Sequence, residues 1–368
     1  MRVGTVKEIK NGETRVGITP EGAAEIVRAG HIVYVEAGCG EGSGFGDDDY
    51  RSRGAIVCKS ADEVWSNSDM VVKVKEILPP EYPMLRERQI LIAFLHLAED
   101  YNPAMLKALL SARTCALALE QIVLPDGTRP AIVPMSEIAG YLAAVTAAQL
   151  LQRTHGGPGL VLGNVSGVLP VRAVVLGGGI VGQTAARTLA GLGADVVLFE
   201  VNHSVLRKLS GLMPPNVKVV YSNAFDLKHA LRECRVLINA IYPKPDQRVV
   251  VSREMVRSMP EGSVLIDVGG STTVETSRYT TLSDPVYVEE GVLHYCVDNT
   301  PALVPKTSTP ALANVTLPII LALAGRGLQE SLRQDRSLRN ALVTYDGELV
   351  NEEVAMRQGF EDWHAVNW

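Results

Sequence analysis

Short apolar runs alternate with amphipathic stretches over roughly the first third of the chain. The runs are rich in Val and Ile and are bounded by turn-forming residues, which is typical of buried strands. They predict strands over 2–5, 32–36, 70–74, 90–94 and 114–118. The stretches between them predict helices over 20–30, 61–67 and 103–111. The first of these helices begins with Thr19-Pro20, a capping residue followed by proline at the first helical position.

A second series of the same kind occupies the middle of the chain. It predicts strands over 173–176, 195–199, 217–220, 236–239 and 264–267. It also predicts helices over 181–192 and 226–233. The segments 134–153 and 309–324 are apolar on most faces, so they are expected to be long buried helices. The more polar tail to residue 368 is predicted to be helical.

The clearest motif is the glycine-rich segment 177–182, which reads GGGIVG. It follows an apolar strand, opens an Ala-rich helix and leads to a second apolar strand that ends in an acid, which is the βαβ fingerprint of dinucleotide binding. Gly177 makes the tight turn, Gly179 lets a pyrophosphate approach the backbone, and Gly182 lets the helix pack on the strand. The first N–H groups of the helix are expected to face the phosphates.

The acid that ends the second strand, Glu200, indicates which dinucleotide is bound. A carboxylate at this position accepts both ribose hydroxyls of NAD and repels the 2′-phosphate of NADP. No arginine follows it in 201–203. The sequence therefore predicts NAD as the cofactor. A strand–helix turn without a nucleotide is the alternative, which the complete βαβ context disfavours.

Together these patterns predict an α/β fold with two Rossmann-like domains that have parallel sheets. The NAD-binding domain is expected over 129–305, inserted into a discontinuous domain. That substrate-binding and catalytic domain is expected over 1–128 and 306–368.

Composition narrows the function classes. Lys and Arg number 35 against 41 for Asp and Glu, so no nucleic-acid partner is expected. The five cysteines are scattered without a CxxC pair, which argues against disulfides and zinc clusters and fits a cytoplasmic protein. The seven histidines show no HxxxH spacing, so no metal site is expected. The segment 303–324 contains several prolines and a lysine, so it is expected to be a buried helix and not a membrane span. No membrane is therefore expected as a partner.

Several stretches outside the glycine motif resemble the alanine dehydrogenase and pyridine nucleotide transhydrogenase family, and its alanine dehydrogenase branch most. They are VGTVKE (3–8), RVGITP (15–20), GEGSGF (40–45), VKVKE (72–76), FLHLA (94–98), PMS (134–136) and HYCV (294–297). The resemblance implies an NAD-dependent oxidoreductase that converts L-alanine or a similar small L-amino acid reversibly to the 2-oxo acid and ammonia. It also implies a homo-oligomer, either a hexamer or a dimer.

The resemblance further implies the residues of the substrate site. Arg15 and Lys75 would bind the substrate carboxylate and carbonyl, and Met135 would also bind the substrate. Lys75 and His96 would be catalytic, with His96 as the acid and base. The chemistry suits these residue types, because Arg grips a carboxylate through two hydrogen bonds and His titrates near neutral pH. Taken singly, each has a structural alternative: a surface ion pair for Arg15, a solubilising edge-strand lysine for Lys75, and a buried hydrogen-bonded histidine for His96.

The same resemblance implies a set of NAD-contacting residues on turns and strand ends of the nucleotide-binding half. They are Ser136, Gly177, Gly179, Ile180, Val181, Gly182, Glu200, Ser222, Ala240, Ile241, Asp267, Val297 and Asn299.

Three segments depart from the family pattern. The loop 267–276 is shorter than in alanine dehydrogenases and lacks a second aspartate that the family carries in the active site. The segment 297–301 reads Val-Asp-Asn-Thr-Pro in place of Val-Ala-Asn-Met-Pro, and this pattern resembles the saccharopine dehydrogenase branch. The segment 239–245 reads Asn-Ala-Ile-Tyr-Pro-Lys-Pro, where the family has Gly-Ala-Val-Leu-Val-Pro-Gly. Leu119 stands where the family commonly has tyrosine.

These departures leave more than one function open. Asp298 is our candidate for the lost catalytic carboxylate, whereas a neutral loop change with Asp298 capping a turn is the alternative. The part of the substrate pocket that binds the amine could differ from that of the family. In that case the protein would instead be an NADH-dependent imine reductase of the opine or saccharopine type, which joins an oxo acid to an amino acid. A catalytically impaired NAD sensor is a further alternative, which the retention of Arg15, Lys75 and His96 disfavours.

Overall fold

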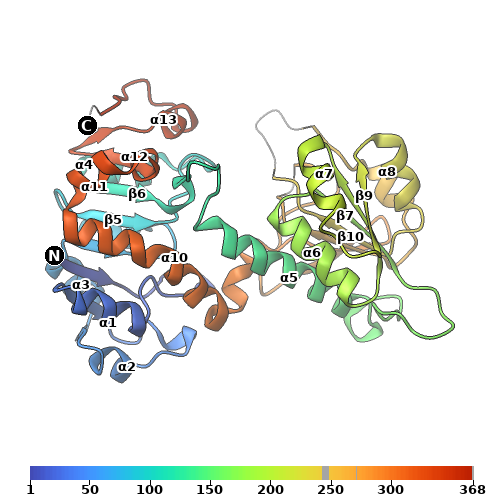
Figure 1. The fold of residues 1–368 in the computed structure, drawn as a ribbon, viewed down its shortest axis with the longest axis horizontal. Coiled ribbons are helices and arrows are strands. Elements are labelled where there is room, and N and C mark those ends of the chain that lie inside the picture. The colour runs from blue at the N-terminus through green and yellow to red at the C-terminus, as the bar shows by residue number, and fades with distance from the viewer. Residues whose placement is uncertain (243–247, 271, 367–368) are drawn as a thin grey trace. The chain divides into compact units, whose positions relative to one another are not determined.

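The computed structural model of the protein describes residues 1–242, 248–270 and 272–366. Contacts divide the chain into two compact units. One consists of Met1–Met135 with Ala302–Trp368, and the other of Ser136–Pro301, so the predicted boundaries differ from these by several residues. Each unit contains one mainly parallel sheet, and the predicted α/β fold is confirmed (Figure 1).

The first unit contains an eight-stranded sheet in the order β15-β14-β6-β5-β4-β1-β2-β3. Its strands are β1 (Arg2–Thr5), β2 (Ile32–Glu36), β3 (Ile56–Cys58), β4 (Met70–Val72), β5 (Ile90–Ala93), β6 (Cys115–Ala118), β14 (Leu342–Tyr345) and β15 (Glu348–Leu349). The strands β1–β6 are parallel, and β14 and β15 are antiparallel to their neighbours. The chain leaves β1 toward β2 and β3, then crosses back to β4, so the strand order reverses between β1 and β4.

Helices cover both faces of this sheet in Figure 1. They are α1 (Pro20–Arg28), α2 (Asp47–Arg51), α3 (Ala61–Asn67), α4 (Pro103–Ser111), α10 (Pro305–Arg326), α11 (Leu328–Gln334), α12 (Arg336–Ala341) and α13 (Glu352–Gln358). As predicted, Thr19 caps α1, since its hydroxyl accepts the N–H of Gly22. Val71 and Leu91 of the strands pack into one apolar cluster with Trp65 of α3.

The tail contains the helices α11, α12 and α13, as predicted, but it also contains the hairpin of β14 and β15, which the sequence did not predict. The strand β14 pairs with β6, with Leu342 opposite Leu117, and thereby satisfies a backbone edge that β6 would otherwise expose. Two predicted strands, 70–74 and 90–94, end early, at Val72 and Ala93. The backbone N–H of Val74 bonds to the side chain of Glu8 instead of a neighbouring strand, so β4 ends at Val72.

The second unit contains a seven-stranded sheet in the order β12-β13-β11-β10-β7-β8-β9. Its strands are β7 (Arg172–Leu176), β8 (Asp195–Glu200), β9 (Val217–Tyr221), β10 (Val236–Asn239), β11 (Val264–Asp267), β12 (Val286–Glu289) and β13 (Val292–Tyr295). The sequence did not predict β12 and β13; β12 is antiparallel to β13 at the edge. Here the strand order reverses between β7 and β10, which is the doubly wound arrangement of dinucleotide-binding sheets.

Alternate residues of the central strand β7 point to opposite faces of the sheet. Val175 packs in a cluster with residues of α5 and α6, whereas Val174 packs in a cluster with residues of α8 and α9. The helices are α5 (Ile132–Leu150), α6 (Ile180–Gly191), α7 (His203–Ser210), α8 (Ala224–Leu231) and α9 (Arg253–Arg257). Burial on both faces explains why the strands are continuous apolar runs.

The helix α10 is, within the described part of the chain, the one long and apolar enough to cross a membrane by length and composition. Its side chains Leu312, Ile320 and Leu323 are buried in the first unit. Burial of this kind is the usual arrangement of a core helix, as the sequence predicted.

Candidate active site

The candidate catalytic residues follow neighbouring parallel strands of the first unit. Arg15 lies after β1, Lys75 after β4 and His96 after β5. Because parallel strands end at one edge of a sheet, all three lie on the carboxyl edge, where the strand order reverses between β1 and β4. Open α/β sheets bind ligands at such a switch point. A Cβ on Gly17 would lie 2.5 Å from the carbonyl oxygen of Val72, so the loop after β1 passes close to the end of β4.

Lys75 and His96 are in direct contact. The Lys75 Nζ lies 3.2 Å from the Nε2 of His96, and Lys75 is only 7% exposed. Two adjacent cations are unfavourable in such a buried place, so the contact disfavours a state in which both groups are protonated cations. The pair can therefore hold and pass on one proton. An edge-strand lysine does not describe Lys75, because β4 lies inside the sheet and the side chain is buried.

Arg15 is held by a buried carboxylate. Its Nε lies 2.8 Å and its Nη2 2.5 Å from the two carboxylate oxygens of Glu13, and Arg15 is 2% exposed. The Nη1 lies 3.1 Å from the sulfur of Met135. Since Arg15 is buried, the alternative of a surface ion pair does not hold. The two-point contact with Glu13 fixes the plane of the guanidinium.

A second buried ion cluster supports the segment that carries Lys75. The Lys73 Nζ lies 3.0 Å from a Glu8 oxygen and 2.7 Å from a Glu81 oxygen. The other Glu8 oxygen accepts the backbone N–H of Val74 at 2.6 Å. Burial alone would lower the pKa of Lys73, but the charges of the two carboxylates raise it above its ordinary value. Lys73 therefore stays charged, and the cluster anchors the backbone directly before Lys75.

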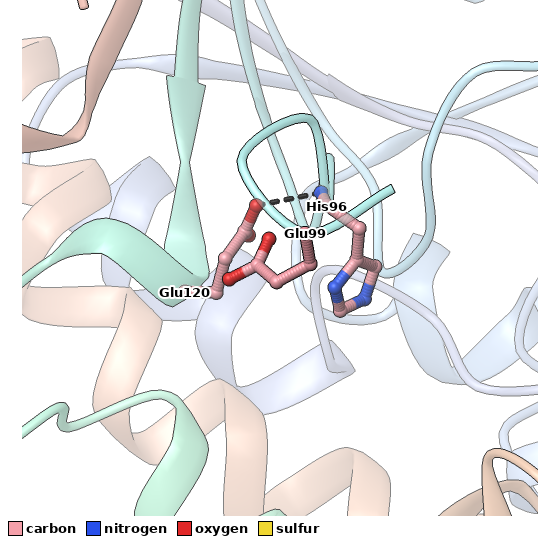
Figure 2. Close-up of side chains that lie close together, drawn as sticks. All are labelled: His96, Glu99 and Glu120. Atoms are coloured by element: carbon pink, nitrogen blue, oxygen red, sulfur yellow. Dashed lines mark hydrogen bonds between the residues drawn. The ribbon is translucent and has the colours of Figure 1, made fainter. Parts of the chain in front are cut away.

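Glu120 and Glu99 lie beside His96, as Figure 2 shows. Glu120 is 2% exposed, and its two oxygens accept the N–H of His96 at 2.6 Å and that of Leu95 at 3.2 Å. A ring nitrogen of His96 and one oxygen from each carboxyl group lie within 4.8 Å of one another. Burial raises the pKa of Glu120 to about 7, and the charge of Glu99 adds to the shift.

This group of three could also take a divalent cation by composition. The ammonium of Lys75 already places a positive charge 3.2 Å from the Nε2 of His96 and would repel such an ion. We therefore assign no metal to it, and the absence of a metal stays a prediction from the sequence.

The glycine motif forms the turn between β7 and α6 in the second unit. Gly177 has a φ of +94°, which favours glycine. A Cβ on Gly182 would lie 1.9 Å from the carbonyl oxygen of Gly177, so close packing requires this glycine. A Cβ on Gly179 would meet no atom within 4 Å. The space in front of Gly179, at the start of α6 with Ile180 and Val181, is open, as the predicted pyrophosphate site requires.

Glu200 is fixed beside this turn. One of its oxygens accepts the N–H of Gly178 at 2.7 Å, and the other accepts the N–H groups of Val201 and Asn202 at 2.7 and 2.8 Å. The backbone of Ser222, after β9, donates to the Glu200 carbonyl at 2.9 Å. The carboxylate thus ends β8 beside the glycine turn, and its role as acceptor for the ribose hydroxyls stays a prediction.

A buried polar group connects the loops that follow β10 and β11. The side-chain amide of Asn239 donates to Asp267 and to Thr273, each at 2.8 Å. Burial raises the pKa of Asp267. The neighbouring Ala240 N–H bonds to the carbonyl of Leu176 at 2.8 Å. This network orders the loop at the switch point between β7 and β10, where Ala240 and Ile241 were expected to contact NAD.

The remaining predicted positions lie in the second unit. Val297 forms a bridge with Thr280, Asn299 has a φ of +55°, and Asp298 between them is exposed. Ser136 is on α5. The roles of these residues stay predictions. Within the altered segments, residues 243–245 and 271 lie outside the described residues.

Sequence reasoning missed the carboxylates that support the catalytic side chains. They are Glu8, Glu13 and Glu120, each less than 8% exposed. The available signal was a charge in apolar surroundings, as in the run ALALE that ends at Glu120. Such buried charges need a partner, but the sequence does not say which one.

Comparisons with known proteins cover almost the whole chain. The family model described as alanine dehydrogenase/PNT, N-terminal domain, matches residues 4–139, and its C-terminal counterpart matches 143–352. An alanine dehydrogenase of Mycobacterium tuberculosis (strain CDC 1551 / Oshkosh) is 43% identical over 98% of this chain and 97% of its own length. That of Geobacillus stearothermophilus is 41% identical over 100% and 99%. A solved L-alanine dehydrogenase structure matches with a TM-score of 0.93 and 40% identity, covering 97% of this chain and 99% of that one.

Proposed function

The chain belongs to the alanine dehydrogenase/PNT family, and we propose that it is an NAD-dependent L-alanine dehydrogenase. The reaction converts L-alanine, NAD⁺ and water to pyruvate, ammonium, NADH and a proton, and it is reversible. The observation that carries the proposal is the Lys75–His96 contact on the same sheet edge as a buried, carboxylate-fixed Arg15.

Each residue has a task that follows from its geometry. Arg15, fixed by Glu13, binds the substrate carboxylate. Lys75 donates a hydrogen bond to the carbonyl oxygen, or to the oxygen of the hydrated imine, and stabilises the negative charge that develops on it. His96 takes a proton from the attacking water in the oxidative direction and returns it in the other. The contact with Lys75 allows the proton to move on from His96.

The second unit supplies the cofactor site. When bound, NAD accepts a hydride from the substrate carbon that carries the amine. Gly179 leaves room for the pyrophosphate, the start of α6 presents backbone N–H groups, and Glu200 accepts the ribose hydroxyls. We further propose that Met1–Met135 with Ala302–Trp368 is the substrate domain and that Ser136–Pro301 is the NAD domain. A cytoplasmic homo-oligomer is part of the same proposal, by analogy with the family.

A second candidate function rests on the altered segment at Asp298. An exposed carboxylate at this position, together with the shortened loop after Asp267, favours a bulkier amine than ammonia. In that case the protein would reduce the imine formed between an oxo acid and an amino acid. Under both proposals Asp298→Ala should lower turnover steeply, and a rate within a few-fold of the parent would remove Asp298 from the site.

The deciding experiment follows NADH consumption by the purified protein. One arm contains pyruvate with ammonium, and the others contain an oxo acid with a panel of primary-amine amino acids. We expect rapid turnover with pyruvate and ammonium, and a kcat lower by roughly 10²- to 10⁴-fold in His96→Gln. Turnover only with an oxo acid and an amino acid would replace the alanine dehydrogenase assignment by the imine reductase.

A further inference from the structure

The carboxylate of Glu120 is bonded to the backbone that carries His96. Glu120 lies in the short 3-10 helix Leu119–Gln121, directly after β6, and His96 is the third residue after the neighbouring strand β5. One oxygen accepts the His96 N–H at 2.6 Å, and the other accepts the Leu95 N–H at 3.2 Å. Both N–H groups belong to the chain just beyond the last residue of β5. The carboxylate therefore accepts backbone N–H groups at the point where hydrogen bonding between the strands ends.

The backbone of His96 has an unfavourable conformation. Its φ is +54°, in the left-handed region that a non-glycine residue seldom adopts. The His96 carbonyl accepts the N–H groups of Glu99 at 3.2 Å and Asp100 at 2.7 Å, which closes a turn on one side. Glu120 holds the N–H on the other side. A strained backbone of this kind persists only when its surroundings fix it.

This conformation decides where the imidazole lies. Before the turn, the N–H of Phe94 bonds to the carbonyl of Val74, which joins the end of β5 to the segment of Lys75. The turn at His96 then brings its Nε2 to 3.2 Å from the Lys75 Nζ. If the two N–H groups lost their acceptor, the backbone could relax to a negative φ and the ring would leave Lys75.

We propose that Glu120 is a positioning residue for the reaction: by binding the N–H groups of Leu95 and His96 it holds the left-handed turn and keeps the imidazole against Lys75. The proposal deepens the proposed function and rests on His96 as the acid–base residue. Glu120 acts through His96 and needs no contact with substrate or cofactor.

The test compares Glu120→Ala and Glu120→Gln with the control Glu99→Gln. The Glu99 carboxyl belongs to the same cluster, but the N–H groups of Leu95 and His96 bond to Glu120. The first measurement is backbone hydrogen exchange by mass spectrometry. In Glu120→Ala the amides of residues 95 and 96 should exchange at least about 10-fold faster, whereas those of β10 stay unchanged. Glu120→Gln keeps one carbonyl acceptor, so it should be intermediate.

The second measurement is turnover of pyruvate with ammonium. In Glu120→Ala, kcat should fall by at least about 20-fold while the Kd of NADH stays within about 2-fold of the parent. The solvent deuterium isotope effect on kcat should increase, because proton transfer through a displaced His96 becomes slower. A merely structural role would lower the active fraction without changing the isotope effect. Glu120→Gln, expected to fold if Glu120→Ala does not, should lie between in kcat as well.

The proposal is overturned if the amides of residues 95 and 96 exchange as in the parent, or if Glu99→Gln is as damaging as Glu120→Ala. It is equally overturned if exchange increases but kcat and the isotope effect do not change. A failure of the proposed function looks different, because the parent itself would then be inactive. Even with an inactive parent, the exchange measurement tests whether Glu120 stabilises the turn at Leu95 and His96.

Discussion

The ammonium nitrogen of Lys75 lies 3.2 Å from the Nε2 of His96, although 21 residues separate them in the chain. The two side chains come from the adjacent strands β4 and β5, whose ends lie together on the carboxyl edge of the sheet. At this distance one of the two nitrogens donates a hydrogen bond to the other. The two groups can thus share one proton. A site that oxidises its substrate needs such groups, because the reaction releases a proton that must be taken up.

Replacement of either partner should disable proton transfer. We expect Lys75→Met and His96→Gln each to lower kcat by roughly 10²- to 10⁴-fold. Since the two residues act as a unit, the double variant should be little worse than the poorer single variant. Steady-state NADH oxidation with pyruvate and ammonium measures this, with the exposed Lys107→Met on α4 as the control. Strictly additive losses would show that the two groups act independently.

The orientation of Arg15 should depend on Glu13. Glu13→Gln keeps the size of the side chain but removes the charge that holds Nε and Nη2. We expect the KM of pyruvate to rise by roughly 10-fold or more, because a buried charged contact is lost, while the Kd of NADH is unchanged. Glu25→Gln is the matched control, since its pair with Arg28 is exposed and contributes little. Equal effects of the two substitutions would contradict a role for Glu13.

Two glycines of the NAD motif should respond differently to a methyl group. Gly179→Ala places its Cβ in open space, so it should weaken NADH binding by roughly 10-fold and leave the melting temperature unchanged. Gly182→Ala places a Cβ 1.9 Å from the carbonyl oxygen of Gly177. That overlap should cost about 1–3 kcal/mol of stability as well as NADH affinity.

Gly191→Ala is the control for both, because its Cβ would meet no atom within 4 Å at the far end of α6. Fluorescence titration with NADH and thermal melting measure the two properties. A Gly179→Ala protein that binds NADH like the parent would show that the pyrophosphate does not approach this backbone.

The carboxyl of Glu120 should make stability depend on pH. Burial raises its pKa from 4.5 to about 7, so the folded protein keeps a proton that the unfolded chain has released. Its contribution is therefore complete below about pH 4.5, and it falls as the pH rises to about 7 and then levels off. The total change is about 3 kcal/mol, at about 1.4 kcal/mol for each pKa unit.

Urea unfolding followed by the fluorescence of Trp65, which is buried in the first unit, measures this dependence. The free energy of unfolding of the parent should fall between about pH 5 and 7 relative to that of Glu120→Gln, which lacks the titrating group. Parallel curves for the two proteins would show that Glu120 does not titrate in this pH range.

Local sequence patterns were enough to identify most of the reactive groups. The turn 177–182 is recognisable because each glycine meets a steric need within one βαβ unit, and Glu200 follows at the end of the next strand. Arg15, Lys75 and His96 were found as residue types within motifs, and the alternating apolar runs located most strands to within a few residues. Short elements such as β3 and the hairpin β14–β15 were missed, because a few apolar residues have no distinct periodicity.

The contacts between these groups depend on how distant parts of the chain pack together. Glu120 and His96 are 24 residues apart, and Glu8 and Lys73 are 65 apart. Their contacts follow from the order in which the strands lie in the sheet, and hydrophobic periodicity does not encode that order. The left-handed turn at His96 likewise exists because a distant carboxylate holds it, against the local preference of the residue. Thus local sequence supplied the reactive side chains, and long-range packing supplied the buried acids that fix their positions.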